Sequence, residues 1–226
     1  MSIEVDGRTF DWYPRKDPRS LAFTVADNFA TAKSLRTRTR LQYQYLDQGS
    51  EGACTGFGSA KALGQTPDRR IVDNRLAQSI YHRARQLDEW PGEDYEGSSV
   101  LAAMQTVREA GFISAYYWAT SLKQMQHAVC HLGSLVIGIN WYEAMFDTDS
   151  GGFVNAHGDL VGGHAICVGG LDLGRSAFIL HNSWGQSWGG RGGAPKGSAF
   201  LSFKDAERLV IGERGEAALM RKKRQR

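Results

Sequence analysis

The stretch DQGSEGACTGFGSAKA, residues 47–62, is the part of the chain around which the rest is interpreted. It places Cys54 six positions after Gln48, at the start of a run of small residues from Thr55 to Ala60. Small side chains let a helix pack tightly against its neighbours. Its glycines lower the intrinsic helix stability, so packing must hold such a helix in place. The stretch therefore predicts a tightly packed helix that begins near Cys54.

Cys54 has two interpretations at this point. If it lies at the helix N-terminus, the exposed N–H groups and the positive end of the helix dipole stabilise a thiolate. Gln48, in the preceding loop, can then donate its amide to a developing oxyanion. The alternative is a structural role, because cysteines outside disulfides are commonly small buried hydrophobic residues. The stretch alone leaves both interpretations open.

Two later segments supply the partners that a catalytic cysteine needs, a base and a group that orients the base. His164 lies in the apolar, glycine-flanked run GGHAICVGG, and Asn182 ends the apolar run FILHN. The order of these residues and their surroundings resemble the papain-like cysteine peptidases, in particular compact members poor in disulfides. The matching pieces are Gln48-Gly49, Cys54, His164-Ala165, Asn182-Ser183-Trp184-Gly185 and Trp188-Gly189-Gly190.

The resemblance implies four catalytic roles. Cys54 is the nucleophile, and His164 is the base that later acts as an acid. Asn182 orients the His164 ring, and the Gln48 side chain stabilises the oxyanion together with the Cys54 backbone N–H.

The same resemblance implies a set of substrate-binding residues. Gly97 corresponds to a glycine that pairs with the peptide backbone, and Ala165 lines the pocket for the residue two before the cut. Gly163 leaves the side next to His164 open, and Trp184 covers the contact between His164 and Asn182. One departure from the family is Thr55, where a tryptophan often follows the cysteine.

Periodicity predicts helices first and strands afterwards. Besides the Cys54 helix, one helix is expected after a cap at Asp73 or Asn74, with apolar positions from Leu76 to Leu87. Two more are expected after a Ser98 cap and at residues 121–132. Strands are expected at residues 135–139, 161–171, 177–181, 199–203 and 217–220. This order predicts an α+β protein. The resemblance implies a papain-like two-lobe fold, with Cys54 on a helical lobe and His164 and Asn182 on an antiparallel β-barrel-like lobe.

The expected domain organisation has three parts. Residues 1–40 form an N-terminal extension packed on the body. Residues 41–220 form the peptidase domain, with the helical lobe at about 41–125 and the β lobe at about 126–220. Residues 221–226 form a basic tail that carries five of the positive charges.

Composition excludes several classes of function. The formal charge of +3 is modest and depends on the tail, so no nucleic-acid partner is expected. No apolar stretch is long enough to cross a membrane, and the start of the chain does not resemble a secretory signal. Three cysteines cannot all pair, which favours a reducing, cytoplasmic location. No metal or organic cofactor is implied.

The predicted function is thiol-dependent hydrolysis of peptide bonds through an acyl-enzyme on Cys54, with a peptide or protein as substrate. Two alternatives remain on the same scaffold. One is an acyl transferase or peptide ligase, and the other is an inactive relative that binds peptides.

Overall fold

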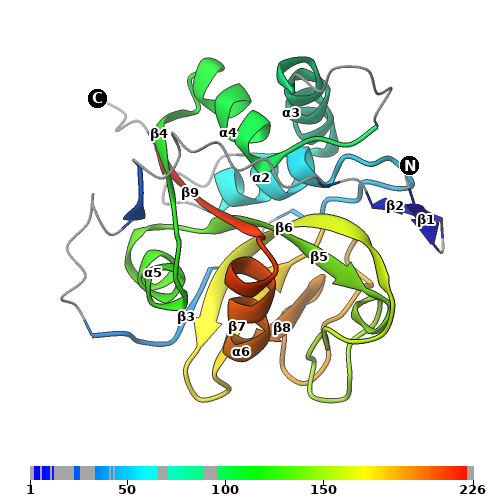
Figure 1. Ribbon diagram of the computed structural model, residues 1–226, viewed down its shortest axis with the longest axis vertical. Helices are drawn as coiled ribbons and strands as arrows, with labels where there is room; N and C mark the ends of the chain where they lie inside the picture. The colour runs from blue at the N-terminus through cyan, green and yellow to red at the C-terminus, as the bar shows by residue number, and fades with distance from the viewer. Residues whose placement is uncertain are drawn as a thin grey trace.

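The computed structural model describes residues 3–5, 7–10, 12, 23–25, 34–40, 42, 44–65, 71–88 and 96–222. Most of the expected N-terminal extension and the tail after Lys222 therefore lie outside the described residues. The described elements form a layer of helices over one antiparallel sheet, with a short N-terminal hairpin beside the junction of the two (Figure 1).

The helical layer consists of α2 (Cys54–Gly64), α3 (Asn74–Leu87) and α4 (Val100–Glu109). Every residue of α2 is buried. Gly56 makes this packing possible, because a Cβ there would lie 2.3 Å from the carbonyl oxygen of Ala77 in α3. The prediction of a tightly packed helix beginning at Cys54 is therefore confirmed.

Side-chain caps explain where the other two helices begin. The Asp73 carboxylate accepts a hydrogen bond from the backbone N–H of Leu76 at 2.8 Å, as expected. For α4 the prediction is wrong by one residue, because Ser99 is the N-cap. Ser98 instead donates to the carboxylate of Asp88, which also binds Ser99.

The sheet has the strand order β4-β9-β5-β6-β7-β8, all antiparallel, and a short strand β3 also pairs with β6. The strands are β3 (Arg38–Thr39), β4 (Ile113–Trp118), β5 (Leu135–Tyr142), β6 (Leu160–Asp172), β7 (Ala177–His181), β8 (Ser198–Ser202) and β9 (Glu216–Lys222). Within the described part of the chain β4 and β8 remain the two edges of this path, so the sheet is open rather than a closed barrel.

Two features of this layer differ from the expectation. No strand was predicted at β4, which lies within the range 41–125 assigned to the helical lobe, yet it pairs with β9 at the edge of the sheet. The helix expected at 121–132 is α5 (Leu122–His127) continued by a π-helical turn (Ala128–Leu132).

The remaining short elements are a 3₁₀ turn (Glu143–Met145), α6 (Phe203–Glu207) and a second π-helical turn (Arg208–Gly212).

The two faces of the sheet belong to different cores. Val136, Ala165 and Ala218 point into the core that contains α2, α3 and α4. Their strand neighbours Ile137, Ile166 and Ala217 point into the core on the other face. The sheet therefore connects the two lobes, and α2 lies directly on β6.

The N-terminal hairpin consists of β1 (Ile3–Val5) and β2 (Arg8–Phe10). In Figure 1 it lies at the side of the molecule where α2 and β6 meet. No helix among the described residues is long and apolar enough to cross a membrane.

Candidate active site

His164 and Asn182 form the centre of the candidate site. His164 lies in β6 and Asn182 directly follows β7, and both side chains are fully buried. The His164 Nε2 atom lies 2.9 Å from the Asn182 Oδ1 atom. The backbone N–H of Ser183 donates to the same Oδ1 atom at 2.9 Å, which confirms that an oxygen faces the ring. Because that oxygen can only accept, the Nε2 atom carries a hydrogen and the Nδ1 atom of the neutral ring is an acceptor.

Aromatic rings enclose this pair. The rings of Trp184 and Trp141 lie 5.1 Å and 4.7 Å from the His164 ring, measured between centroids. Trp188 packs edge-on against Trp184 and donates its indole N–H to the Phe146 carbonyl at 2.8 Å. The aromatic shell keeps water away from the hydrogen bond between His164 and Asn182, which strengthens that bond.

Cys54 is the first residue of α2 and is fully buried. The residue before the helix is Ala53, whose side chain cannot cap the first N–H groups. One turn later, the Cβ position of Gly58 lies 3.3 Å from the carbonyl oxygen of Ala165, the residue after His164. The glycine thus brings the start of α2 close to the strand that carries His164.

Gln48 is held by hydrogen bonds of both its side chain and its backbone. Its Oε1 atom accepts from the Ser183 hydroxyl at 2.6 Å, and its Nε2 atom donates to the Glu51 carbonyl at 3.0 Å. Its backbone N–H donates to the Ser183 carbonyl at 2.9 Å. These contacts fix the amide plane and leave a second N–H on the Nε2 atom. Ser183 therefore connects the orientation of Gln48 with that of Asn182.

The N-terminal strand β2 covers this site. The Arg8 guanidinium lies 4.4 Å from the centroid of the Trp184 ring. The Phe10 ring packs at 5.9 Å from the His164 ring and at 5.8 Å from the Trp184 ring. The hydroxyl of Thr9 donates to the carbonyl of Ser50, in the loop before Cys54. Residues 8–10 thus contact both the rings around His164 and the loop before Cys54.

Trp12 extends this cover between the two expected substrate-binding segments. Its backbone N–H donates to the Gly163 carbonyl at 2.9 Å, and it forms a parallel bridge with Ser98, which follows the buried Gly97. A Cβ at Gly163 would lie 2.1 Å from the Trp12 carbonyl oxygen. Gly163 was expected to leave an open side next to His164, but in this structure Trp12 lies there.

Burial beneath these residues changes the acid–base behaviour of the histidine. Desolvation, with a smaller contribution from the charge of Arg8, lowers the pKa of His164 from its ordinary value of 6.5 to about 4, against the opposing effect of the Asn182 hydrogen bond. At neutral pH the ring is therefore uncharged while β2 covers it.

The other two cysteines lie away from this centre. Burial raises the pKa of the Cys167 thiol to about 12, and its Sγ atom lies 3.7 Å from Gln65 Oε1. Cys130 contacts the backbone of Arg36 at 3.4 Å. No disulfide joins the three cysteines, all of which are in the described part of the chain. The described residues also contain no group of three or more side chains suited to hold a metal ion.

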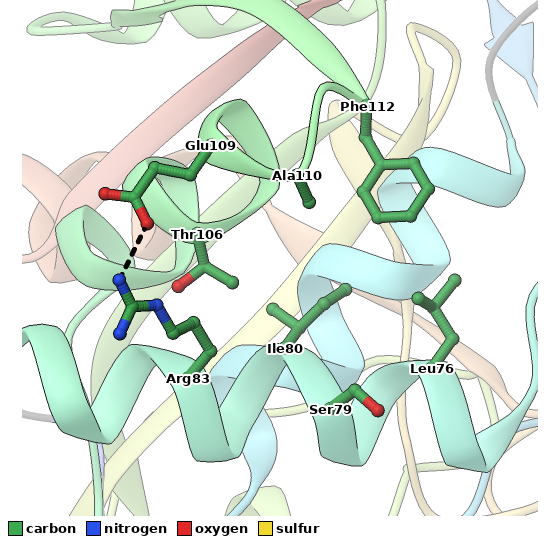
Figure 2. A pocket seen from close by; sticks show the side chains of 8 residues that line it. All are labelled: Leu76, Ser79, Ile80, Arg83, Thr106, Glu109, Ala110 and Phe112. Atoms are coloured by element: carbon green, nitrogen blue, oxygen red, sulfur yellow. Dashed lines mark hydrogen bonds and ion pairs between the residues drawn. The ribbon is translucent and has the colours of Figure 1, made fainter.

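A separate groove of about 290 Å³ lies between α3 and α4 (Figure 2). Leu76, Ile80 and Phe112 form its apolar walls, and the ion pair between Arg83 and Glu109 closes one end. None of the predicted site residues lines this groove, so it is distinct from the centre around His164.

Sequence reasoning missed Phe10, Trp12, Trp141 and Ser183 as parts of the site. For the first two a signal existed, since Arg8, Phe10 and Trp12 alternate with polar residues in RTFDW, as in a strand with one buried face. The adjacent glycines at 162 and 163 were a second signal, because backbone without side chains allows another chain to approach closely. Ser183 and Trp141 gave no such local sign.

Comparison with known proteins agrees with this arrangement. A family model described as papain family cysteine protease matches residues 93–194, a span that contains His164, Asn182 and Trp184. An uncharacterized peptidase C1-like protein of Acanthamoeba polyphaga mimivirus is 25% identical over 64% of this chain and 61% of its own length. A cathepsin B-like cysteine proteinase 3 of Caenorhabditis elegans is 34% identical over 35% of this chain and 22% of its own length. The chain thus spans less than two thirds of the length of each of these relatives.

Solved structures share the fold over a longer span. Xylellain, a cysteine protease from Xylella fastidiosa, has a TM-score of 0.65 at 16% identity, over 99% of this chain and 95% of its own. Procathepsin B from Trypanosoma congolense has a TM-score of 0.65 at 13% identity, over 99% of this chain and 86% of its own. At sequence identities this low, the structural similarity shows only that the fold is shared. Together with the family match around His164 and Asn182, it shows that this chain has the fold of papain-like cysteine proteases and is similar to that family over residues 93–194.

Proposed function

We propose that the protein hydrolyses peptide bonds through a thioester on Cys54. The observation that carries this proposal is the buried pair of His164 and Asn182. Asn182 binds the Nε2 atom at 2.9 Å, so the ring is held by one nitrogen while its other nitrogen stays available for proton transfer. The start of α2, which carries Cys54, lies against the same strand. The match of residues 93–194 to the papain family model supports peptidase chemistry in general.

In the proposed reaction the Cys54 thiol transfers its proton to the His164 Nδ1 atom, and the sulfur attacks the scissile carbonyl. The charge on the carbonyl oxygen is stabilised by the free N–H of Gln48 and by the N–H groups at the start of α2. His164 then gives the proton to the leaving amine as the C–N bond breaks. Water, deprotonated by His164, cleaves the thioester and restores the thiol.

Two alternatives share the thioester and differ in later steps. An acyl transferase or ligase passes the acyl group to an amine instead of water. An inactive relative binds peptides without forming the thioester. The presence of all four catalytic residue types favours the hydrolase over the inactive relative.

The test is to incubate the protein with an epoxide inhibitor of thiol peptidases and to map the modified residue by mass spectrometry. Labelling at Cys54, together with loss of peptide hydrolysis, is the expected result. In parallel, a peptide substrate is incubated with added amine, and free acid is expected as the main product. Labelling only at Cys130 or Cys167, or amide as the main product, would contradict the hydrolase.

The contacts of residues 8–10 and of Trp12 support a second element of the proposal, which is that the N-terminal segment keeps the site closed. A peptide substrate and this segment need the same space beside Gly163 and Ser98. The neighbour from Trypanosoma congolense that shares the fold is a procathepsin B. The protein described here is therefore taken as the latent state.

Acid is expected to release the N-terminal segment. A histidine with a lowered pKa in the closed state binds a proton more weakly there than when exposed. The free energy that favours the closed state over the open state is therefore fully present above pH 6.5, and it is lost as the pH falls towards about 4. With an ordinary pKa in the open state, the equilibrium shifts towards release by about 30-fold at pH 5. Hydrogen exchange of residues 8–12, corrected for intrinsic rates, measures this shift.

The measurement uses a Cys54→Ala background, which prevents self-cleavage. His164→Gln is the matched control, since glutamine does not titrate and should remove the pH dependence between pH 7 and pH 5. If the protection of residues 8–12 from hydrogen exchange does not change with pH, or changes equally in the His164→Gln variant, then a group other than His164 controls the release of the N-terminal segment.

A further inference from the structure

The groove between α3 and α4 has no part in the proposed reaction (Figure 2). One wall comes from α3, where Leu76, Ile80 and Arg83 lie at positions i, i+4 and i+7 and therefore share one helix face. The opposite wall comes from the last turn of α4 and from Phe112, which follows it. None of the residues assigned to catalysis lines the groove, so its role is independent of the proposed function.

The walls of the groove offer apolar surface to a partner. Ile80 is buried, whereas Leu76 and Phe112 pack against the helical core and stay partly exposed. Apolar surface that is hollowed and framed by polar residues is typical of interaction sites. The volume of about 290 Å³ is near the lower end for ligand pockets. A single leucine or phenylalanine side chain of a partner therefore suits it better than a longer apolar stretch.

Thr106 adds a polar group to the floor of the groove. Its side chain points from α4 into the space between the two helices (Figure 2), and the residue is only 5% exposed. Its Oγ1 atom has no hydrogen-bond partner among the described residues. A buried hydroxyl without a partner lowers the stability of the fold, and a bound polar group would relieve this cost. A backbone N–H or C=O next to an inserted side chain is such a group.

Positive charge surrounds the groove on the side of α3. This helix carries three arginines and no aspartate or glutamate between its first and last residues. Arg75, which is exposed, precedes Leu76 at the end of the groove opposite to Arg83 (Figure 2). Arg83 donates to Glu109 at 3.1 Å and to Gln86 at 3.2 Å, and these two bonds leave its other N–H groups for a further acceptor. Both ends of the groove can therefore bind a carboxylate.

We propose that this groove is a docking site for an acidic peptide segment of a protein partner, which inserts one leucine or phenylalanine side chain between α3 and α4. The inserted side chain covers Ile80 and Phe112, and the peptide backbone beside it bonds to the Thr106 hydroxyl. Carboxylates on either side of the inserted residue pair with Arg75 and Arg83. The inserted side chain supplies most of the affinity, and the charges at the rim set the orientation of the segment.

The test is fluorescence anisotropy with a labelled probe peptide and the full chain carrying Cys54→Ala, so that the probe is not cut. The probe contains one phenylalanine with two aspartates on each side. One control peptide has serine in place of the phenylalanine, and another has lysines in place of the aspartates. The probe is expected to bind with a Kd in the micromolar range, and each control peptide at least about tenfold more weakly.

Three variants place the bound probe. Ala110→Trp fills the groove from an exposed position and should weaken binding by about tenfold or more. Arg83→Gln should weaken it by about threefold or more at low salt, and less at high salt. Lys123→Gln removes an exposed positive charge from α5, outside the groove, and is the matched control that should leave the Kd unchanged.

Thr106→Val separates a role in binding from a role in folding. It keeps the shape of the side chain and removes the hydroxyl, so the probe should bind about threefold or more weakly while the unfolding temperature stays the same or rises. A lower unfolding temperature with unchanged binding would contradict the role of the hydroxyl.

Three results would overturn the docking site as a whole. The first is equal binding of the probe and the two control peptides. The second is binding that Ala110→Trp does not weaken, which would place the probe elsewhere on the molecule. The third is self-association of the chain in sedimentation that Ala110→Trp abolishes, because the occupant would then be a second copy of this chain.

Discussion

Replacing Cys54 by alanine is expected to abolish peptide hydrolysis and to leave the fold intact. Removal of the nucleophile from a catalytic set costs on the order of 10⁵-fold or more in rate, because the remaining groups cannot form the covalent intermediate. Alanine keeps the small volume that the buried start of α2 requires, so the packing against α3 and β6 should persist. The measurement is kcat/KM for a fluorogenic peptide, with thermal unfolding as the check on the fold.

The other cysteines are the controls. Cys130→Ala and Cys167→Ala should keep most of the activity, since Cys130 packs in the core and contacts the Arg36 backbone, and Cys167 is a buried thiol with a pKa of about 12. Activity in Cys54→Ala equal to that of the unchanged protein would exclude the proposed mechanism. Loss of activity in a folded Cys130→Ala or Cys167→Ala variant would identify a different thiol.

Gln48→Ala should lower kcat by about 10²- to 10³-fold, or about 3–4 kcal/mol of transition-state stabilisation, with little change in KM. The reason is that the amide donates to an oxygen whose charge exists only after the attack. Alkylation of Cys54 by iodoacetamide forms no tetrahedral oxyanion, so its rate should persist. The ratio of hydrolysis rate to alkylation rate therefore isolates the role of Gln48.

Ser183→Ala serves as a control variant with a smaller expected effect than Gln48→Ala. It removes the 2.6 Å hydrogen bond that holds the Gln48 Oε1 atom but keeps the backbone contacts of Ser183. A smaller loss of kcat is expected, since the amide remains and only its orientation is freed. Equal losses of hydrolysis and alkylation in Gln48→Ala would mean that Gln48 supports the fold or the thiol instead of the oxyanion.

The regular elements that could be predicted are those with a clear local signal. The Asp73-capped helix α3 has an apolar stripe, α2 has a run of small residues that is buried throughout, and the strands before Asn182 and around His164 are apolar runs that are mostly buried. β4 escaped prediction because its pattern is irregular, with two buried residues at its end and mixed exposure before them. Its strand conformation depends on pairing with β9, which lies about a hundred residues later in the chain.

In the candidate site, the pair of His164 and Asn182 was predictable from the resemblance. The alternation in RTFDW and the glycines at 162 and 163 indicated a strand and a close approach, but not that the one would lie against the other. Trp12 lies beside Gly163 and Ser98 through contacts that are distant in sequence and that depend on the completed cleft. No local propensity encodes such contacts. The burial that lowers the pKa of His164 follows from the same cover, so the charge state of the site could not be predicted from the sequence either.

The hydrogen bonds around Ser183 constrain how the cleft can open. The segment at 46–48 and the segment at 183–185 form a short two-stranded clasp, with bonds from Gln48 to Ser183 and from Gly185 to Leu46 and a bridge between Asp47 and Trp184. The clasp joins the loop before α2 to the end of the β lobe. A hinge motion that separates the two lobes would have to break these hydrogen bonds. It would also displace Gln48 and Asn182. We therefore expect the lobes to act as one rigid frame, so that a substrate enters by exchange with the N-terminal segment and not by separation of the lobes.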